Sequence, residues 1–282
     1  MGSASRQPSF RNPLKSILLH AVLLLVAGLT LFPLFWMVSV SLMPPDEANR
    51  FPPPILPSSP TLDHYRILFS RLNLAAYLLN STLVAALVTG LSLLINSMAG
   101  YAFAKLRFKG RDRLFRWLLA SMVIPAQVAM LPLFLMLKEM GLVNTYGGVI
   151  IPGMASIFGI FLIRQYALSI PDSLLDAARI DGAGEFRIYR TLVLPLCKPI
   201  LVTLAIFTFM GAWNDFMWPL IILTDDDLYT LPVALANLLG EHVQDAELMM
   251  AGSVLTVLPV ILLFLALQKY YIEGLVLGSV KE

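Results

Sequence analysis

Six long apolar runs restrict what this chain can fold into. A helix needs roughly 20 apolar residues to cross a bilayer core about 30 Å thick. The runs approach or exceed that length, and they lie near residues 17–40, 74–104, 114–137, 146–163, 200–223 and 249–267. The sequence therefore predicts six helices across a membrane.

The composition agrees with this interpretation. Apolar residues make up 58% of the 282 positions and charged residues only 13%, whereas a soluble domain carries about 25% charged residues. Only helices and closed barrels satisfy every backbone group inside lipid, and barrel strands would show short alternating segments. We expect an all-α membrane protein with one domain over residues 14–273, between polar tails at 1–13 and 274–282. The first run is too long for a signal-peptide core and lacks a cleavage site, so we expect it to remain as the first helix.

The basic residues predict an orientation, because cytoplasmic loops carry an excess of Lys and Arg. With the N-terminus inside, 16 of the 20 Lys and Arg residues fall on the cytoplasmic side. Both termini are then cytoplasmic. The densest basic segment is LRFKGRDRLFR at 106–116, which fits topology determination together with contact to anionic lipid headgroups. The last outer loop is acidic; this charge either attracts a binding protein, through its effect on association rate, or simply keeps the loop soluble.

A polar stretch interrupts the apolar sequence between the fourth and fifth runs, at residues 176–199. Ser173 and Asp176 have the S-x-x-D spacing of a capping box, so a short helix should begin there. Gly182 suits a left-handed cap that ends this helix, and a second helical stretch follows at 185–194. The sequence predicts two short helices with a sharp bend at the cytoplasmic surface. Such a helix either docks a partner or merely lies in the headgroups.

Several kinds of chemistry are disfavoured. The sequence contains no G-x-x-x-x-G-K-[ST], so it has no P-loop for ATP. Cys197 is the only cysteine, which excludes an intrachain disulfide and a Cys-based metal site. The three histidines are scattered, and no nucleophile motif lies within the runs, which argues against a membrane-embedded enzyme. A secondary transporter would need several charged groups near mid-membrane for ion coupling, whereas Asp215 stands nearly alone in the apolar runs.

Trp213, Asn214 and Asp215 form a polar group inside the fifth run. A carboxylate deep in a bilayer costs about 2.5 to 3.5 kcal/mol on insertion scales, so Asp215 should face protein or water. One hypothesis places the three residues on a translocation path, where Trp stacks on a sugar and the others bind hydroxyls. The alternative is packing and hydrogen bonding between helices.

The polar stretch also carries a family resemblance. The pattern D-A-A-x-x-D-G-A at 176–183, followed by L-x-L-P at 192–195, resembles the EAA signature of ABC importer permeases. Five further segments resemble the MalG-type carbohydrate permeases: NSTLVAAL at 80–87, AGYAFAKLRFKGRD at 99–112, RQYALSIP at 164–171, WNDFMWPL at 213–220 and GLVLGSVKE at 274–282. One departure is Asp176, where the family has glutamate.

The resemblance implies a type I importer permease bundle with its core near residues 75–270, and a coupling helix between helices 4 and 5. The residues it implies for contact with a partner ATPase are Asp176, Ala177, Ala178, Asp181, Gly182 and Ala183, with Lys281 in the C-terminal tail as a further contact. The implied partners are a homologous permease, an ATPase dimer that binds ATP and Mg, an extracytoplasmic binding protein and membrane lipid. No cofactor in this chain and no nucleic acid are expected. The implied cellular location is the bacterial cytoplasmic membrane, and the implied solute is a carbohydrate or a related compound such as glycerol phosphate.

Overall fold

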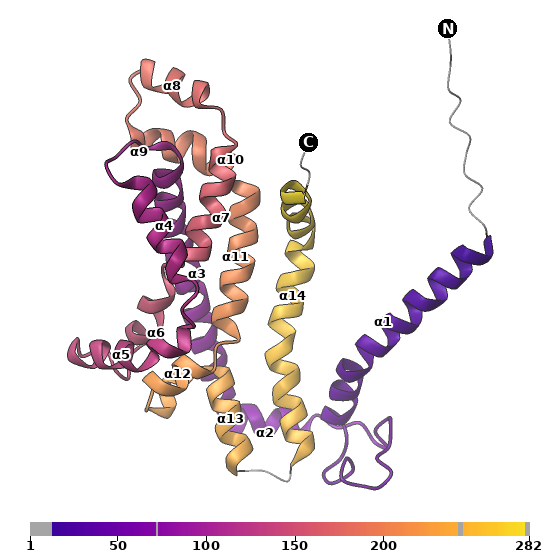
Figure 1. Ribbon diagram of the computed structural model, residues 1–282. Helices are drawn as coiled ribbons and strands as arrows, with labels where there is room; N and C mark the ends of the chain where they lie inside the picture. The colour runs from indigo at the N-terminus through magenta and orange to yellow at the C-terminus, as the bar shows by residue number, and fades with distance from the viewer. Residues whose placement is uncertain (1–12, 72, 242–244, 280–282) are drawn as a thin grey trace. The chain divides into compact units, whose positions relative to one another are not determined.

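The computed structural model describes residues 13–71, 73–241 and 245–279, and within these ranges the chain is helical without strands (Figure 1). Four helical stretches are long and apolar enough to cross a membrane: Lys15–Ser41, Leu74–Lys105, Tyr146–Leu168 and Ala246–Ala266. Two bent helix pairs raise the number to as many as six when each pair counts as one span. The predicted all-α fold with six spans is confirmed in this form.

Three of the predicted runs are broken, and the fourth divides into α6 (Tyr146–Gly153) and α7 (Ile157–Leu168). The third consists of α4 (Arg111–Ser121) and α5 (Ala126–Glu139), which are bent by 103° at a break just before Pro125; a proline disfavours helix at the residue preceding it. The fifth run is not continuous over 200–223, because α11 (Lys198–Trp213) ends and α12 (Met217–Ile222) begins separately. A proline ring clashes with the carbonyl four residues earlier. Pro219 therefore prevents one helix from continuing through 214–216.

Contacts divide the chain into two compact units, residues 1–67 with 242–254 and residues 68–241 with 255–282. In the first, α1 (Pro13–Ser41) leads into an irregular proline-rich segment that ends at α2 (Asp63–Arg71). Buried carboxylates satisfy backbone amides of this segment. Glu47 accepts from the Ser58 amide at 3.2 Å, and Glu247, at the start of α14 (Ala246–Ser279), accepts from the Ala48 amide at 2.9 Å.

The second unit is built around α3 (Leu74–Lys105), which packs along α7 (Ile157–Leu168) and α11 (Figure 1). Close approach requires a small residue at Gly100, because a Cβ there would lie 2.6 Å from the Ile163 side chain. The remaining helices of this unit are α6 (Tyr146–Gly153), α8 (Asp172–Ile180), α9 (Glu185–Ile188), a π-helical turn (Tyr189–Val193), α10 (Leu194–Leu196), a 3-10 turn (Asp226–Leu228) and α13 (Leu231–Glu241).

A polar contact holds the break between α6 and α7. The Asn96 side chain, buried in α3, accepts from the Ser156 amide at 3.0 Å and donates to Ser92 at 2.7 Å. Ser156 in turn caps α7, because its hydroxyl accepts from the Gly159 amide at 3.0 Å. The two helices therefore join at a defined point, although no long helix passes through it.

Candidate functional site

The short helix α8 lies beyond the ends of α7 and α11 (Figure 1). It begins at Asp172, with Pro171 as the N-cap, and no described side chain accepts a capping hydrogen bond there. The predicted capping box of Ser173 and Asp176 is therefore wrong, because the helix starts one residue before Ser173 and places that serine inside its first turn. Asp172 supplies the negative charge that favours a helix N-terminus.

The C-terminal end of α8 confirms the predicted left-handed cap. Gly182 has a φ of 79°. Its amide donates to the Arg179 carbonyl at 3.0 Å, and the Ala183 amide donates to the Ala178 carbonyl at 2.9 Å. This pair of hydrogen bonds is a Schellman motif, which satisfies carbonyls that a helix end leaves free. The chain turns back here toward α9.

The two faces of α8 differ. Leu175 is fully buried and Ala178 packs against the same cluster, together with side chains of α3 and α7. On the opposite face, Leu174, Ala177 and Ile180 are exposed, and Ile180 is 86% accessible. The helix is thus anchored by one leucine and presents an apolar outer face. We call Leu174, Ala177 and Ile180 the outer face of α8.

Ion pairs connect α8 to α9 and then to α3. Arg179 donates to Asp176 at 2.7 Å and to Glu185 at 2.8 Å. These hydrogen bonds, above all the one that Arg179 donates to Glu185, raise the pKa of the Arg179 guanidinium. The Tyr101 hydroxyl, on α3, donates to the other oxygen of Glu185 at 2.6 Å. Asp176 therefore takes part in a network that fixes the bend.

A second link joins α3 to the start of α8. The Lys105 ammonium donates to the Ile170 carbonyl at 2.6 Å and to Asp172 at 2.7 Å, and its side chain is only 5% exposed. Hydrogen bonding to Lys105 and its charge lower the pKa of the Asp172 carboxyl. Lys105 thus bonds the start of α8 directly, and Tyr101 is connected to the end of α8 through Glu185 and Arg179.

These links were not predicted from the sequence. Of the predicted coupling residues, Asp176, Ala177 and Ala178 lie on α8, while Asp181, Gly182 and Ala183 form its cap. The predicted set thus occupies the second half of α8 and its C-terminal cap. The structure adds Tyr101, Lys105, Arg179 and Glu185 as the residues that hold this segment in place. Their charges were visible, but nothing in the sequence pattern paired them.

The structure separates the predicted pathway residues. Trp213 is buried, donates from its indole nitrogen to the Thr256 carbonyl at 3.0 Å and stacks on Phe209 at 5.8 Å. Asn214 is exposed and donates to the Met210 carbonyl at 2.9 Å. The contacts of Trp213 fit packing and hydrogen bonding between helices. Asp215, the third residue of the group, lies at a cavity instead.

Asp215 lines a cavity of about 590 Å³. One oxygen of its carboxylate accepts from the Trp218 amide at 3.3 Å. The wall is mostly apolar, with a few hydroxyls, and none of the described residues that line it is basic. The lining residues come from α3, α5, α6, α7, α11 and α12 and from the Asp215 turn, and they include Ser92, Ser156, Phe207, Thr208, Gly211 and Trp218.

The remaining predicted contact, Lys281, lies outside the described residues. Helix α14 continues to Ser279, so residues 274–279 of the predicted tail are helical.

Comparison with known proteins identifies the family. The model of the family described as "Binding-protein-dependent transport system inner membrane component" matches residues 96–275. The arabinooligosaccharides transport system permease protein AraQ of Halalkalibacterium halodurans is 39% identical over 96% of this chain and 98% of its own. The lactose transport system permease protein LacG of Rhizobium radiobacter is 32% identical over 97% and 99%. The sn-glycerol-3-phosphate transport system permease protein UgpE of Salmonella typhi is 30% identical over 93% and 96%.

Solved structures agree with these relatives. A chain of a bacterial ABC transporter involved in the import of the acidic polysaccharide alginate superimposes with a TM-score of 0.82, at 25% identity over 94% of this chain and 99% of that one. A second alginate transporter chain, in complex with an alginate pentasaccharide-bound periplasmic protein, has a TM-score of 0.65 at 14% identity, over 92% and 95% of the two chains, and so shares the fold. This chain therefore belongs to the family of inner membrane components of binding-protein-dependent transport systems.

Proposed function

We propose that this chain is one of two permease subunits of an ABC importer, and that it carries a carbohydrate delivered by an extracytoplasmic binding protein. ATP and Mg are bound by a separate ATPase dimer, since the sequence has no P-loop. The chain resides in the bacterial cytoplasmic membrane with both termini in the cytoplasm, as its distribution of basic residues favours.

The outer face of α8 is the observation that carries this proposal. An apolar patch on a short helix, with Ile180 almost fully exposed, suits insertion into a partner's groove. Lys105 of α3 bonds Asp172 at the start of α8, and Tyr101 of α3 bonds Glu185, which in turn pairs with Arg179 in the last turn of α8. Displacement of α8 by the ATPase is therefore passed to a membrane-spanning helix instead of being absorbed by a loop.

The Asp215 cavity supports a neutral solute. A single carboxylate and a few hydroxyls can accept and donate hydrogen bonds to sugar hydroxyls, while apolar walls favour the faces of sugar rings. Arabino-oligosaccharides and lactose are the solutes in the names of two relatives. The name of a third relative favours glycerol phosphate as a second candidate. Glycerol phosphate is disfavoured because Asp215 is negatively charged and no Lys, Arg or His is among the described residues that line this cavity.

The test uses the complete importer, purified with its partners and reconstituted in vesicles. ATP-dependent uptake is measured for labelled arabino-oligosaccharide, lactose and sn-glycerol-3-phosphate. We expect uptake of at least one neutral sugar. Exclusive uptake of glycerol phosphate would identify the second candidate, and sugar uptake that continues without ATP would point to a secondary transporter.

Coupling through α8 is tested separately with Ile180→Glu. A charge on the outer face should abolish co-purification of the ATPase, because a carboxylate would have to be buried unpaired. The matched control is Ile55→Glu, since Ile55 is also exposed but lies in the proline-rich segment. Normal ATPase recovery with Ile180→Glu, or equal loss with both variants, would contradict the proposed docking role.

A further inference from the structure

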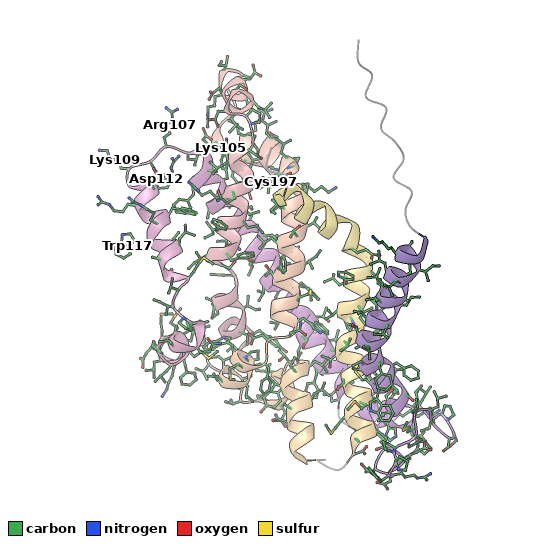
Figure 2. All side chains as sticks on the ribbon, turned by 45° about the vertical axis from the view of Figure 1, so that its right-hand side comes forward. Lys105, Arg107, Lys109, Asp112, Trp117 and Cys197 are labelled. Atoms are coloured by element: carbon green, nitrogen blue, oxygen red, sulfur yellow. The ribbon has the colours of Figure 1, made fainter. Side chains whose placement is uncertain are left out.

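A basic depression lies beside the start of α4. It has a volume of about 710 Å³ and is predominantly polar. Its lining residues belong to the loop after α3 and to the first turns of α4: Arg107, Phe108, Gly110, Arg111, Asp112, Arg113 and Arg116. Figure 2 shows Arg107, Lys109 and Trp117 on this loop and helix. We call it the α4 basic pocket.

The charges of this region are not balanced. Residues 107–116 contain five basic residues and one acid, for a formal charge of +4. The one carboxylate, Asp112, pairs with Arg111 at 3.0 Å. Lys109 and Arg113 form no ion pair with any described residue, and Arg116 donates only to the Asp112 backbone carbonyl, at 3.3 Å. Cations held close together without counter-charges create a positive potential that attracts an anion.

A second, mostly apolar depression adjoins the pocket. It has a volume of about 580 Å³ and is lined by Arg113, Arg116, Trp117 and Ala120. Arg113 and Arg116 therefore border both depressions, a polar one toward the loop and an apolar one along α4. Trp117 is 70% exposed beside them. A ligand that fills both must have an anionic end and an apolar end.

The orientation of α4 is set from the opposite side. Phe115 is buried against Phe103 and Ile160, and the Arg164 guanidinium lies 4.2 Å above its ring. This anchor turns the face with Arg113, Arg116 and Trp117 outward. Tryptophan is enriched at the membrane–water interface, where an apolar ring meets polar headgroups. The arrangement continues directly from the end of the membrane-spanning α3.

We propose that residues 107–120 form a binding site for an anionic phospholipid. Its phosphate lies between Arg113 and Arg116, and its acyl chain runs along Trp117 and Ala120. A free phosphate would share the contacts to the guanidinium groups but would leave the apolar depression empty. The two depressions together therefore favour a phosphate that belongs to a lipid over free inorganic phosphate.

The experiment titrates the purified full chain in neutral detergent with phosphatidylglycerol or zwitterionic phosphatidylcholine, and lipid adducts are counted by native mass spectrometry. Wild type should bind phosphatidylglycerol preferentially. In R113Q/R116Q, this binding should weaken roughly 10- to 30-fold, since each basic residue near a surface contributes severalfold to the attraction of anionic lipid. The matched control R187Q/R190Q removes two exposed arginines elsewhere and should bind like wild type.

Two further measurements keep the proposal falsifiable if R113Q/R116Q does not fold. R113K/R116K keeps the charges and should keep the preference, and brominated phosphatidylglycerol should quench wild-type fluorescence more than that of Trp117→Phe. Equal binding of both lipids by wild type would overturn the proposal. So would unchanged binding in R113Q/R116Q, equal loss in the control, or displacement of the lipid by millimolar inorganic phosphate, which would identify a soluble-anion site.

Discussion

Substitution of Gly182 isolates the backbone's contribution to coupling. Its φ of 79° lies in the left-handed region, and no described heavy atom outside its immediate neighbours lies within 4 Å of a Cβ built there. A new side chain meets no clash, so the cost is conformational. For an ordinary L-residue the left-handed region costs roughly 1–2 kcal/mol, which shifts the population of the native cap about 5- to 30-fold. Asparagine tolerates this region better than alanine, and valine tolerates it least.

We therefore expect a graded series. ATPase affinity should fall in the order Gly182→Asn, Gly182→Ala, Gly182→Val, because each substitution makes the Schellman cap less populated. The assay titrates the ATPase subunit onto the membrane-inserted permease and measures the bound fraction and the solute-stimulated ATP hydrolysis. Gly182→Ala should raise the ATPase concentration needed for half-saturation about 5- to 30-fold, and Gly182→Val should raise it further.

Gly184 is the matched control. It lies two residues away and is equally open, but its φ of −70° suits any residue. Gly184→Val should bind the ATPase almost normally. If Gly184→Val loses as much affinity as Gly182→Val, or if Gly182→Asn loses as much as Gly182→Val, the backbone conformation is not the cause and this reasoning is refuted.

Four further predictions concern the links to α3 and the cavity. Lys105→Met should uncouple ATP hydrolysis from solute transport, because Asp172 and the Ile170 carbonyl lose their buried partner. The measurement is the stimulation of ATP hydrolysis by solute, which should be lost; retained stimulation would contradict a role of the Lys105 link in coupling. The pKa of Asp172 is lowered below its usual 3.8, so this ion pair stabilises the fold above pH 3.8 and is lost only as pH falls through the lowered value; melting curves at stepped pH in wild type and Lys105→Met should diverge least at the most acidic pH. Tyr101→Phe should cost about 1.5 to 3 kcal/mol, because it removes a hydrogen bond to the Glu185 carboxylate, and this loss should appear as a lower denaturation midpoint with the spans intact. Asp215→Asn should reduce uptake while ATPase binding stays normal; unchanged uptake would assign the residue to packing.

Hydropathy predicted the membrane spans because the requirement is simple: each run must be apolar and long enough. The same criterion does not detect bends, since the residues around Pro125 and Asn214 remain apolar enough to continue a run. The bends depend on proline stereochemistry, which a hydropathy window averages away. Gly182 was predictable for the opposite reason, because a left-handed helix cap depends on a single residue type.

The links that hold α8 were beyond the sequence. Lys105 and Asp172 are 67 residues apart, and Tyr101 and Glu185 are 84 apart. One basic and one acidic side chain could pair with many others, and only the packing of α3 against α7 selects these partners. The Trp213 group shows the same limit: three adjacent polar residues suggested one site, but the end of α11 sends Trp213 into the core and Asp215 to the cavity.

The attachment of both ends of α8 to a single helix has a mechanical consequence. Tyr101 and Lys105 are four residues apart, so they stand one turn above each other on α3. Lys105 bonds α8 directly and Tyr101 reaches it through Glu185 and Arg179, so a rotation of α8 relative to α3 would break at least one of these hydrogen bonds. The movement that preserves these links is one in which α8 and α3 move together. A force applied at Ile180 would then reach α3 through these polar links and through the packing of the buried Leu175, and not only through the covalent loops on either side of α8.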